Sequence, residues 1–172
     1  RGLVGSEMCI RDRQLDRREK ELGILDTVMV ELQRSEQVQM SGRPIAKGWL
    51  SSAYGNRMDP ITGQPAWHAG VDFAGSQGSD VLAVASGVVV FADRRDGYGK
   101  LVEINHGNGV STRYGHHDKL LVKAGEIVKK GDVIGLMGSS GRSTGPHVHF
   151  EVLRNGRNID PTRFISGNAS GG

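Results

Sequence analysis

The chain has 172 residues, of which 26 are glycine, and hydrophobic residues make up 37% of it. This composition indicates a globular fold rich in turns and excludes a disordered chain. Because no apolar run approaches the ~20 residues that span a bilayer, the sequence also predicts no transmembrane helix. The net charge of +3 mildly favours anionic partners, and no cluster of basic and aromatic residues indicates nucleic-acid binding.

The start of the chain does not resemble a native N-terminus. The run from Met8 to Arg13 resembles the translation of a transposon sequencing adapter. We therefore expect residues 1–12 to be non-native and the true start of the protein, with any export signal or membrane anchor, to be missing. Cys9 is the only cysteine in the chain. If it is not native, disulfide bonds and thiol catalysis are both excluded.

Residues 13–40 are rich in strong helix formers and contain no proline and one glycine. Apolar residues recur along them at heptad spacing, at Leu15, Leu22 and Met29, with Leu25 and Leu32 in between. This pattern predicts the end of a coiled coil, which would hold the next domain at a distance, mediate self-association or bind a regulatory partner. A helix packed on its own domain is the alternative. The run Ser41–Pro44 breaks the helix and opens a linker over residues 41–47.

From Gly48 the pattern changes to short runs rich in valine and isoleucine, separated by glycine turns. It predicts an all-β domain, mostly antiparallel, over residues 48–165, followed by a disordered tail at 166–172. The strands that we expect are 70–74, two strands within 80–92 hinged at Ser86–Gly87, 101–104 and 110–114. Turns are expected at 96–99 and 106–109, and a loop at 54–64.

Two histidines lie one residue apart in the run Gly145–Val152, which is otherwise typical of a strand. Side chains alternate between the faces of a strand, so His147 and His149 point the same way, while Val148 and Phe150 point into the core. Two imidazoles on one face of a rigid strand can supply part of the ligand set of a metal site, because imidazole is neutral near neutral pH and suits zinc. By itself such a pair is a weak signal.

Two further histidines strengthen the metal interpretation. His68 precedes Asp72 by four residues, and Gly70 and Val71 between them argue against a helix, so we expect His68 in a loop and Asp72 on the following strand. A catalytic zinc takes three protein ligands and leaves a fourth position for water. His68, Asp72 and one histidine of the pair would supply the three ligands. His116 and the other histidine of the pair would be free for acid–base chemistry.

These motifs, in this order, resemble the zinc endopeptidases of the M23 family, the lysostaphin-type or LytM-like peptidases. The resemblance extends from about Gly48 to Phe164 and rests on three runs: His68-x-x-x-Asp72, Tyr114-Gly115-His116 and His147-Val148-His149. It implies the mainly antiparallel β domain of that family, related to the duplicated hybrid motif, with one Zn²⁺ per chain held by His68, Asp72 and His149. His116 and His147 would share the proton transfers of peptide hydrolysis.

The resemblance also implies a substrate, the peptide part of bacterial peptidoglycan, with the cross-link between D-alanine and diaminopimelate as the expected bond. The protein would then remodel the cell wall in the cell envelope, in the periplasm of a Gram-negative bacterium. A non-catalytic LytM-like activator of a cell-wall amidase is the alternative, although such relatives depart at the motif positions and this chain retains all of them. A lipoyl or biotin carrier is disfavoured, since the chain has no lysine in a Met-Lys-Met hairpin.

Other residues near the motifs are candidate contacts of the substrate: Arg57, Tyr114, Ser143 and Thr144. For Arg57 and Tyr114 a structural role is the competing interpretation. The loop at 138–145, rich in glycine and serine, lacks the Lys-Ser/Thr ending of a phosphate-binding loop, so we expect it to form one wall of the groove. His117 lies next to His116 and competes with it for the proton-transfer role, but the Tyr-Gly-His run favours His116. His117 and the remaining histidine, His106, are therefore expected at the groove edge or on the surface.

Overall fold

The computed structural model describes residues 40–165. The adapter-like residues 1–12, the predicted coiled-coil helix before residue 40 and the predicted tail at 166–172 lie outside this range. Among the residues within it, no helix is long and apolar enough to cross a membrane.

The described residues form strands and one short helix. In chain order these are β1 (Trp49–Ser52), β2 (Gly55–Met58), β3 (Pro65–His68), β4 (Val71–Ala74), β5 (Asp80–Leu82), β6 (Gly87–Arg95), β7 (Gly99–Gly107), β8 (Val110–Leu120), β9 (Ile127–Val128), β10 (Val133–Met137), β11 (His147–Arg154), β12 (Arg157–Ile159) and α2 (Thr162–Ile165). Every strand pairing in this part of the chain is antiparallel. The predicted all-β, mainly antiparallel domain is therefore confirmed.

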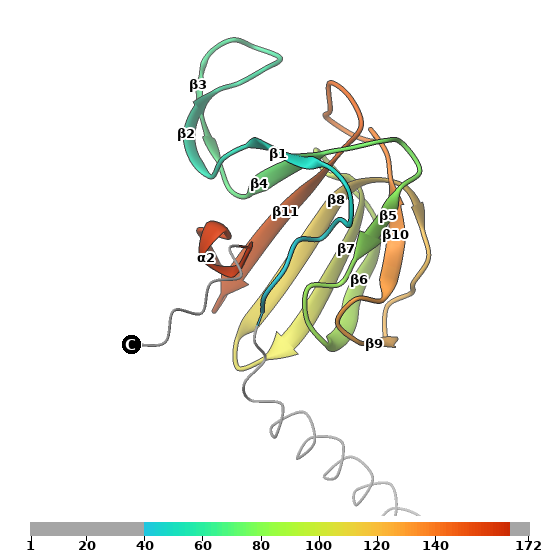
Figure 1. The fold of residues 1–172 in the computed structure, drawn as a ribbon. Coiled ribbons are helices and arrows are strands. Elements are labelled where there is room, and N and C mark those ends of the chain that lie inside the picture. Colours follow the sequence, from blue (N-terminus) through green and yellow to red (C-terminus); the bar gives the residue numbers. More distant parts are fainter. Residues whose placement is uncertain (1–39, 166–172) are drawn as a thin grey trace, which may run out of the picture. The chain divides into compact units, whose positions relative to one another are not determined.

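One large sheet organises the domain, and its main path runs β1-β4-β11-β8-β7-β6-β9 (Figure 1). β10 pairs with both β8 and β5, β12 pairs with β11, and β2 and β3 form a separate hairpin. Strand β11, which carries the His-x-His pair, is thus flanked by β4 and β8. These two neighbours carry Asp72 and His116, so the sheet brings distant motifs side by side.

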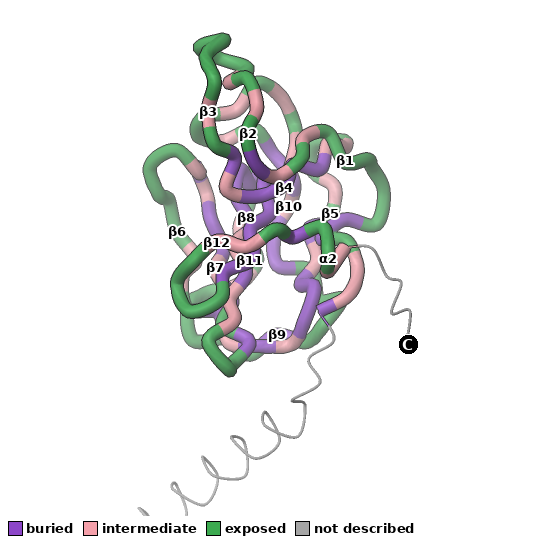
Figure 2. The backbone as a smooth tube through the Cα atoms, turned by 90° about the vertical axis from the view of Figure 1, so that its left-hand side faces the viewer, coloured by how far each residue is buried: buried purple, intermediate pink, exposed green. Residues whose placement is uncertain are grey.

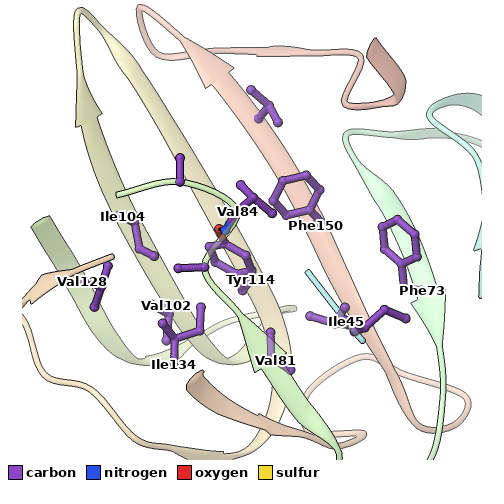
Figure 3. Packing of buried hydrophobic residues seen from close by; sticks show 14 of the residues in the cluster. Ile45, Phe73, Val81, Val84, Val102, Ile104, Tyr114, Val128, Ile134 and Phe150 are labelled. Atoms are coloured by element: carbon purple, nitrogen blue, oxygen red, sulfur yellow. The ribbon is translucent and has the colours of Figure 1, made fainter. Parts of the chain in front are cut away.

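One face of β11 packs into the hydrophobic core. Val148 and Phe150 are completely buried, as the alternation along this strand predicts. Phe150 packs on Tyr114 of β8 with ring centroids 5.3 Å apart, and Val81 of β5 and Ile134 of β10 belong to the same cluster (Figure 3). Burial of each such side chain stabilises the fold by about 1.5–3 kcal/mol. The central strands are buried along most of their length, whereas the β2–β3 hairpin is largely exposed (Figure 2).

A close contact between backbones fixes the segment that joins His68 to Asp72. A Cβ atom on Gly70 would lie 2.3 Å from the carbonyl oxygen of Phe150 in β11, so only glycine fits at this position. The glycine therefore allows the start of β4 to lie directly against β11.

The structure corrects two predictions about the preceding segment. The expected loop at 54–64 contains a strand, since β2 pairs with β3, and His68, expected in a loop, is the last residue of β3. These short strands are mostly exposed and carry no alternating apolar pattern that sequence reasoning could detect. Backbone pairing and the edge-on contact of Tyr54 with Trp67, with ring centroids 5.2 Å apart, hold the hairpin instead.

Candidate metal centre

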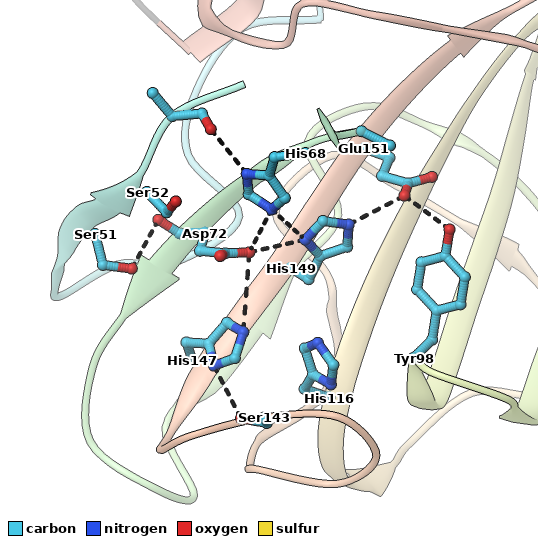
Figure 4. Close-up of polar contacts among 12 residues, drawn as sticks. Ser51, Ser52, His68, Asp72, Tyr98, His116, Ser143, His147, His149 and Glu151 are labelled. Carbon is cyan, nitrogen blue, oxygen red and sulfur yellow. Dashed lines mark hydrogen bonds and ion pairs between the residues drawn. The ribbon is translucent and has the colours of Figure 1, made fainter. Parts of the chain in front are cut away.

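The three predicted ligands meet where β3, β4 and β11 come together. In the register of the sheet, His149 lies directly opposite Asp72, and His68 ends the strand just before β4. His149 Nδ1 lies 2.7 Å from Asp72 Oδ1, His68 Nε2 lies 3.2 Å from the same oxygen, and the two nitrogens are 3.1 Å apart (Figure 4). All three side chains are buried.

Hydrogen bonds on the far side of each imidazole direct the other ring nitrogen toward this common point. His68 Nδ1–H donates to the backbone carbonyl of Ala53 at 2.8 Å, and His149 Nε2–H donates to Glu151 Oε1 at 3.0 Å. Two imidazole nitrogens and one carboxylate oxygen, each ring held from behind by a hydrogen bond, form a donor set that suits a catalytic zinc ion.

Asp72 brings a negative charge to this cluster, and His149 brings a proton that a metal ion would replace. Burial alone would raise the pKa of Asp72, but hydrogen bonds with His149 and His68 hold it well below its ordinary value, so the carboxylate is ionised. Burial lowers the pKa of His149, yet hydrogen bonds with Asp72 and Glu151 outweigh it and raise that pKa to about 9. A metal ion at the point where the donors meet would replace the proton shared between His149 and Asp72, as metal binding requires.

His116 of β8 and His147 of β11 lie beside these ligands, with ring centroids 4.6 Å apart. In each ring Nδ1–H donates to a backbone carbonyl, that of Ser140 at 2.6 Å for His116 and that of Gly145 at 2.8 Å for His147. Nε2 is therefore the atom that each ring has free for chemistry, and His147 Nε2 lies 3.8 Å from Asp72 Oδ1. Such a pair can accept a proton at one ring and donate one at the other.

The backbone of His116 has a conformation that residues other than glycine rarely adopt. Its φ angle is 64°, in the left-handed region. Its N–H donates to the carbonyl of Tyr98 at 2.7 Å, which together with the ring contact to Ser140 holds it there. Burial lowers the pKa of His116 to about 4, and the nearby His147 and His149 add to this effect. The ring is therefore neutral near neutral pH and able to accept a proton.

The centre opens into a cleft of about 850 Å³. One wall is the β2–β3 hairpin, and the other is the loop between β10 and β11, as expected for the residues at 138–145. Ser143 and Thr144 line this second wall. Arg57 of β2 also lines the cleft, and its guanidinium donates to Asp72 Oδ2 at 2.9 Å, so it contacts the carboxylate oxygen that faces away from the histidines.

Tyr114, the other candidate contact of the substrate, lies outside the cleft. It is completely buried in the core, where the backbone N–H of Val84 donates to its hydroxyl oxygen at 3.1 Å. Tyr114 and His116 are two residues apart on β8, but the pairing of β8 with β7 shifts register between Tyr114 and His117, and His116 has a left-handed φ, so the regular alternation of faces is interrupted there. The structural role that competed with substrate contact fits this position.

The expected exposure of His106 and His117 is wrong, since both are buried. His106 Nδ1–H donates to the carbonyl of Ser86 at 2.8 Å, and its Nε2 lies 2.7 Å from the hydroxyl of Thr112. His117 Nδ1–H donates to the carbonyl of Lys100 at 3.1 Å, whereas its Nε2 has no hydrogen-bond partner among the described residues. The packing of the sheet decides this burial, which no local pattern of residues indicates.

Sequence reasoning missed Glu151 and Tyr98. Glu151 follows His149 by two residues on the same face of β11, is 1% exposed, and accepts a hydrogen bond from the Tyr98 hydroxyl at 2.8 Å. Burial raises the pKa of Tyr98 to about 12, and the negative charge of Glu151 adds to the shift, so the hydroxyl keeps its proton. The signal was present in the sequence, because the alternation that links His147 to His149 continues to Glu151.

Comparison with known proteins agrees with this geometry. Residues 66–161, more than half of the chain, match the model of peptidase family M23. The chain is 45% identical over 118 residues to the DD-carboxypeptidase/endopeptidase Mpg of Neisseria meningitidis, covering 69% of this chain and 27% of that protein. It is 42% identical over 119 residues to the peptidoglycan DD-endopeptidase ShyA of Vibrio cholerae, covering 68% of this chain and 28% of that protein. The chain thus spans about a quarter of the length of these curated relatives.

A solved structure shares the fold. A zinc-containing peptidase from Vibrio cholerae superposes with a TM-score of 0.66 at 37% sequence identity, over 74% of this chain and 40% of that one. The similarity in sequence and the similarity in structure therefore lead to the same group of proteins.

Proposed function

Because this chain belongs to peptidase family M23, we propose that it is a zinc-dependent endopeptidase that hydrolyses peptide cross-links in bacterial peptidoglycan. The observation that carries the proposal is the convergence of His68, Asp72 and His149 beside His116 and His147 in one cleft. Hydrolysis of an unactivated amide needs both an electrophilic centre and groups that move protons. This cleft offers ligands for the first and two rings for the second.

The donor set fits zinc better than calcium or magnesium, because two of its three donors are imidazole nitrogens. His68 Nε2, Asp72 Oδ1 and His149 Nδ1 would hold one ion per chain. Zinc bound there supplies a Lewis acid that polarises the scissile carbonyl and lowers the pKa of water toward ~7. The zinc-containing peptidase of similar fold from Vibrio cholerae supports this choice of metal.

The two remaining histidines carry the protons. As water attacks the carbonyl carbon of the peptide, Nε2 of one ring, which starts neutral, accepts a proton from it. As the C–N bond breaks, the other ring, which starts with a proton on both nitrogens, donates its Nε2 proton to the leaving nitrogen and becomes neutral. The carbonyls of Ser140 and Gly145 hold Nδ1–H of His116 and His147, so each ring presents the same nitrogen throughout. Neither ring has to change its tautomer between the steps.

The substrate assignment is supported by the relatives. ShyA is named as a peptidoglycan DD-endopeptidase and Mpg as a DD-carboxypeptidase/endopeptidase, which favours the D-alanyl–diaminopimelate cross-link and a place of action in the cell envelope, in the periplasm. Arg57, Ser143 and Thr144 line the cleft and are the contacts that we propose for the peptide. Self-association or a regulatory partner would act through the predicted helix before residue 40.

Digestion of purified peptidoglycan tests the proposal. The 172-residue chain is incubated with peptidoglycan from a Gram-negative bacterium, with and without chelator, and the fragments are weighed by mass spectrometry. We expect about one zinc per chain and a loss of cross-linked dimers that chelator prevents, and the fragment masses identify the bond. The variant His68→Ala, which removes one ligand, is the control and should neither bind zinc nor cleave.

Two outcomes would contradict the proposal in different ways. Bound zinc without cleavage would contradict the substrate and the bond. Absence of both zinc and cleavage would contradict the hypothesis that the chain is a zinc endopeptidase and favour the non-catalytic amidase activator.

A further inference from the structure

We propose that Glu151 is a positioning residue of the metal centre, which holds the His149 ring so that Nδ1 faces the other two ligands. This inference rests on the metal site of the proposed function. It concerns a residue outside the set of three ligands, which acts through the histidine that it contacts.

The burial of Glu151 requires compensation. A carboxylate that is 1% exposed loses its hydration and is stable only when hydrogen bonds replace the lost water. Oε1 accepts from His149 Nε2–H at 3.0 Å and from the Tyr98 hydroxyl at 2.8 Å. Oε2 accepts from the Asn158 side-chain amide at 2.9 Å and, more distantly, from Arg113 at 3.4 Å. The donors come from β11, the β6–β7 turn, β12 and β8, so Glu151 is fixed from several sides.

The fixed carboxylate decides which nitrogen His149 presents. A histidine can offer either ring nitrogen to a metal, and the partner of the second nitrogen makes the choice. His68 offers Nε2 because its Nδ1–H is bound to the carbonyl of Ala53, whereas His149 offers Nδ1 because its Nε2–H is bound to Glu151. A flip of the His149 ring would break this hydrogen bond and move Nδ1 away from Asp72. The negative charge behind the ring also raises the basicity of the nitrogen that faces the metal.

The charged side chains next to Glu151 provide a matched control. Arg113 lies between two carboxylates, with Glu103 at 2.8 Å and Glu151 at 3.4 Å. Glu103 contacts the same arginine as Glu151, and its ion pairs, with Arg95 and Arg113, involve no residue of the metal centre. Loss of charge at Glu103 therefore perturbs the same ion-pair cluster without disturbing His149.

The test measures the zinc affinity of the folded, metal-free 172-residue chain by competition with a chromophoric chelator. The variants are Glu151→Gln, which keeps the shape but removes the charge, Tyr98→Phe, which removes one hydrogen bond that orients Glu151, and Glu103→Gln. We expect affinity to fall about 10- to 100-fold in Glu151→Gln, and less in Tyr98→Phe, but to be unchanged in Glu103→Gln. The thermal unfolding midpoint of each metal-free variant is measured first, and zinc affinity is then compared at a temperature at which all variants are folded.

A cobalt spectrum adds a readout that a merely structural role would not change. In Co²⁺-loaded protein, Glu151→Gln should shift the visible absorption bands, because the orientation and basicity of one ligand change, while Glu103→Gln should reproduce the spectrum of the unaltered protein. Equal zinc affinity and equal spectra in the unaltered protein and Glu151→Gln would overturn the role of Glu151 and leave the proposed function intact. Failure of the unaltered protein to bind zinc would overturn both.

Discussion

At the scale of single residues, the four histidines of the site share one feature. In each ring, the nitrogen that faces away from the centre makes a hydrogen bond. Backbone carbonyls hold Nδ1–H of His68, His116 and His147, and the carboxylate of Glu151 holds Nε2–H of His149. Each ring therefore has one nitrogen left for the centre. Because these contacts differ from ring to ring, three rings present Nε2 and one presents Nδ1.

Replacement of His116 or His147, the two histidines of the centre that are not predicted ligands, should slow catalysis strongly without loss of the metal. In His116→Asn and His147→Ala we expect kcat to fall about 10²- to 10⁴-fold, the usual contribution of a proton-transfer group, with zinc content unchanged. Asparagine is chosen for position 116 because it tolerates the left-handed backbone found there. Steady-state cleavage of cross-linked peptides and zinc analysis measure both effects. Loss of zinc together with activity would instead point to a structural role for the ring.

His117 should make the stability of the fold depend on pH. Burial lowers its pKa to about 4, below the ~6.5 of an exposed histidine. Between these values the unfolded chain binds a proton that the folded one does not, so stability is full above pH ~6.5 and is lost as the pH falls toward 4. We expect this residue to account for about 1–3 kcal/mol of the loss.

Urea unfolding of metal-free protein at pH 7 and pH 4.5 measures that effect. The variant His117→Gln has no ring to titrate, and the other titrating groups are shared, so the difference between the two pH dependences isolates His117. Parallel pH dependences in the variant and the unaltered protein would disprove the prediction.

At the scale of elements, the site depends on how two walls approach the sheet. The β2–β3 hairpin delivers His68 and Arg57 from one side, and the loop between β10 and β11 delivers Ser143 and Thr144 from the other. Arg142 of that loop donates to Asp59 of the hairpin at 2.6 Å, an exposed ion pair between the walls. Water screens an ion pair this exposed, so it contributes little to stability and can open when a peptide enters.

The turn between β3 and β4 should tolerate no side chain at Gly70. In Gly70→Ala the new Cβ would lie 2.3 Å from the carbonyl oxygen of Phe150, so β4 and β11 must separate, and with them Asp72 and His149. We expect a loss of about 1–3 kcal/mol of stability and weaker zinc binding. Gly145→Ala is the control for stability, since a Cβ there meets nothing within 4 Å and its φ is not left-handed. Equal unfolding midpoints in the two variants would refute the prediction.

At the scale of the whole domain, β11 joins stability to chemistry. Val148 and Phe150 anchor one face of this strand in the core, while His147, His149 and Glu151 occupy the other face. A strand held on one side by packed apolar groups keeps the side chains on its other side in fixed positions. The same strand pairs with β4 and β8, so the predicted ligands and the histidines that we propose for proton transfer share one rigid support.

Zinc should stabilise the folded domain, because the ligands converge only when the sheet has formed. At a free zinc concentration 100 times the dissociation constant we expect a gain of about 2.7 kcal/mol in the free energy of unfolding. Thermal or urea unfolding with buffered zinc and with chelator measures the difference. His68→Ala, which lacks one ligand, should show little gain, and an equal gain in that variant would mean that zinc binds elsewhere.

The sequence by itself determined the fold class and the set of residues that converge at the centre. Glycine-punctuated valine and isoleucine runs predict an antiparallel β domain, and alternation places His147 and His149 on one face, because both signals are local and follow from the two-residue repeat of a strand. The resemblance of the motifs adds His68, Asp72 and His116.

Only the tertiary structure decided what depends on contacts between distant segments. The polar β2 strand, the burial of His106 and His117, the place of Tyr114 in the core and the hydrogen bond of Tyr98 to Glu151 all follow from pairing and packing across the sheet. A local pattern does not show which strand lies next to which. The identity of a polar residue likewise does not show whether water or another side chain completes its hydrogen bonds. The choice of ring nitrogen in His68 and His116 is likewise set by the carbonyls of Ala53 and Ser140, which are distant in sequence.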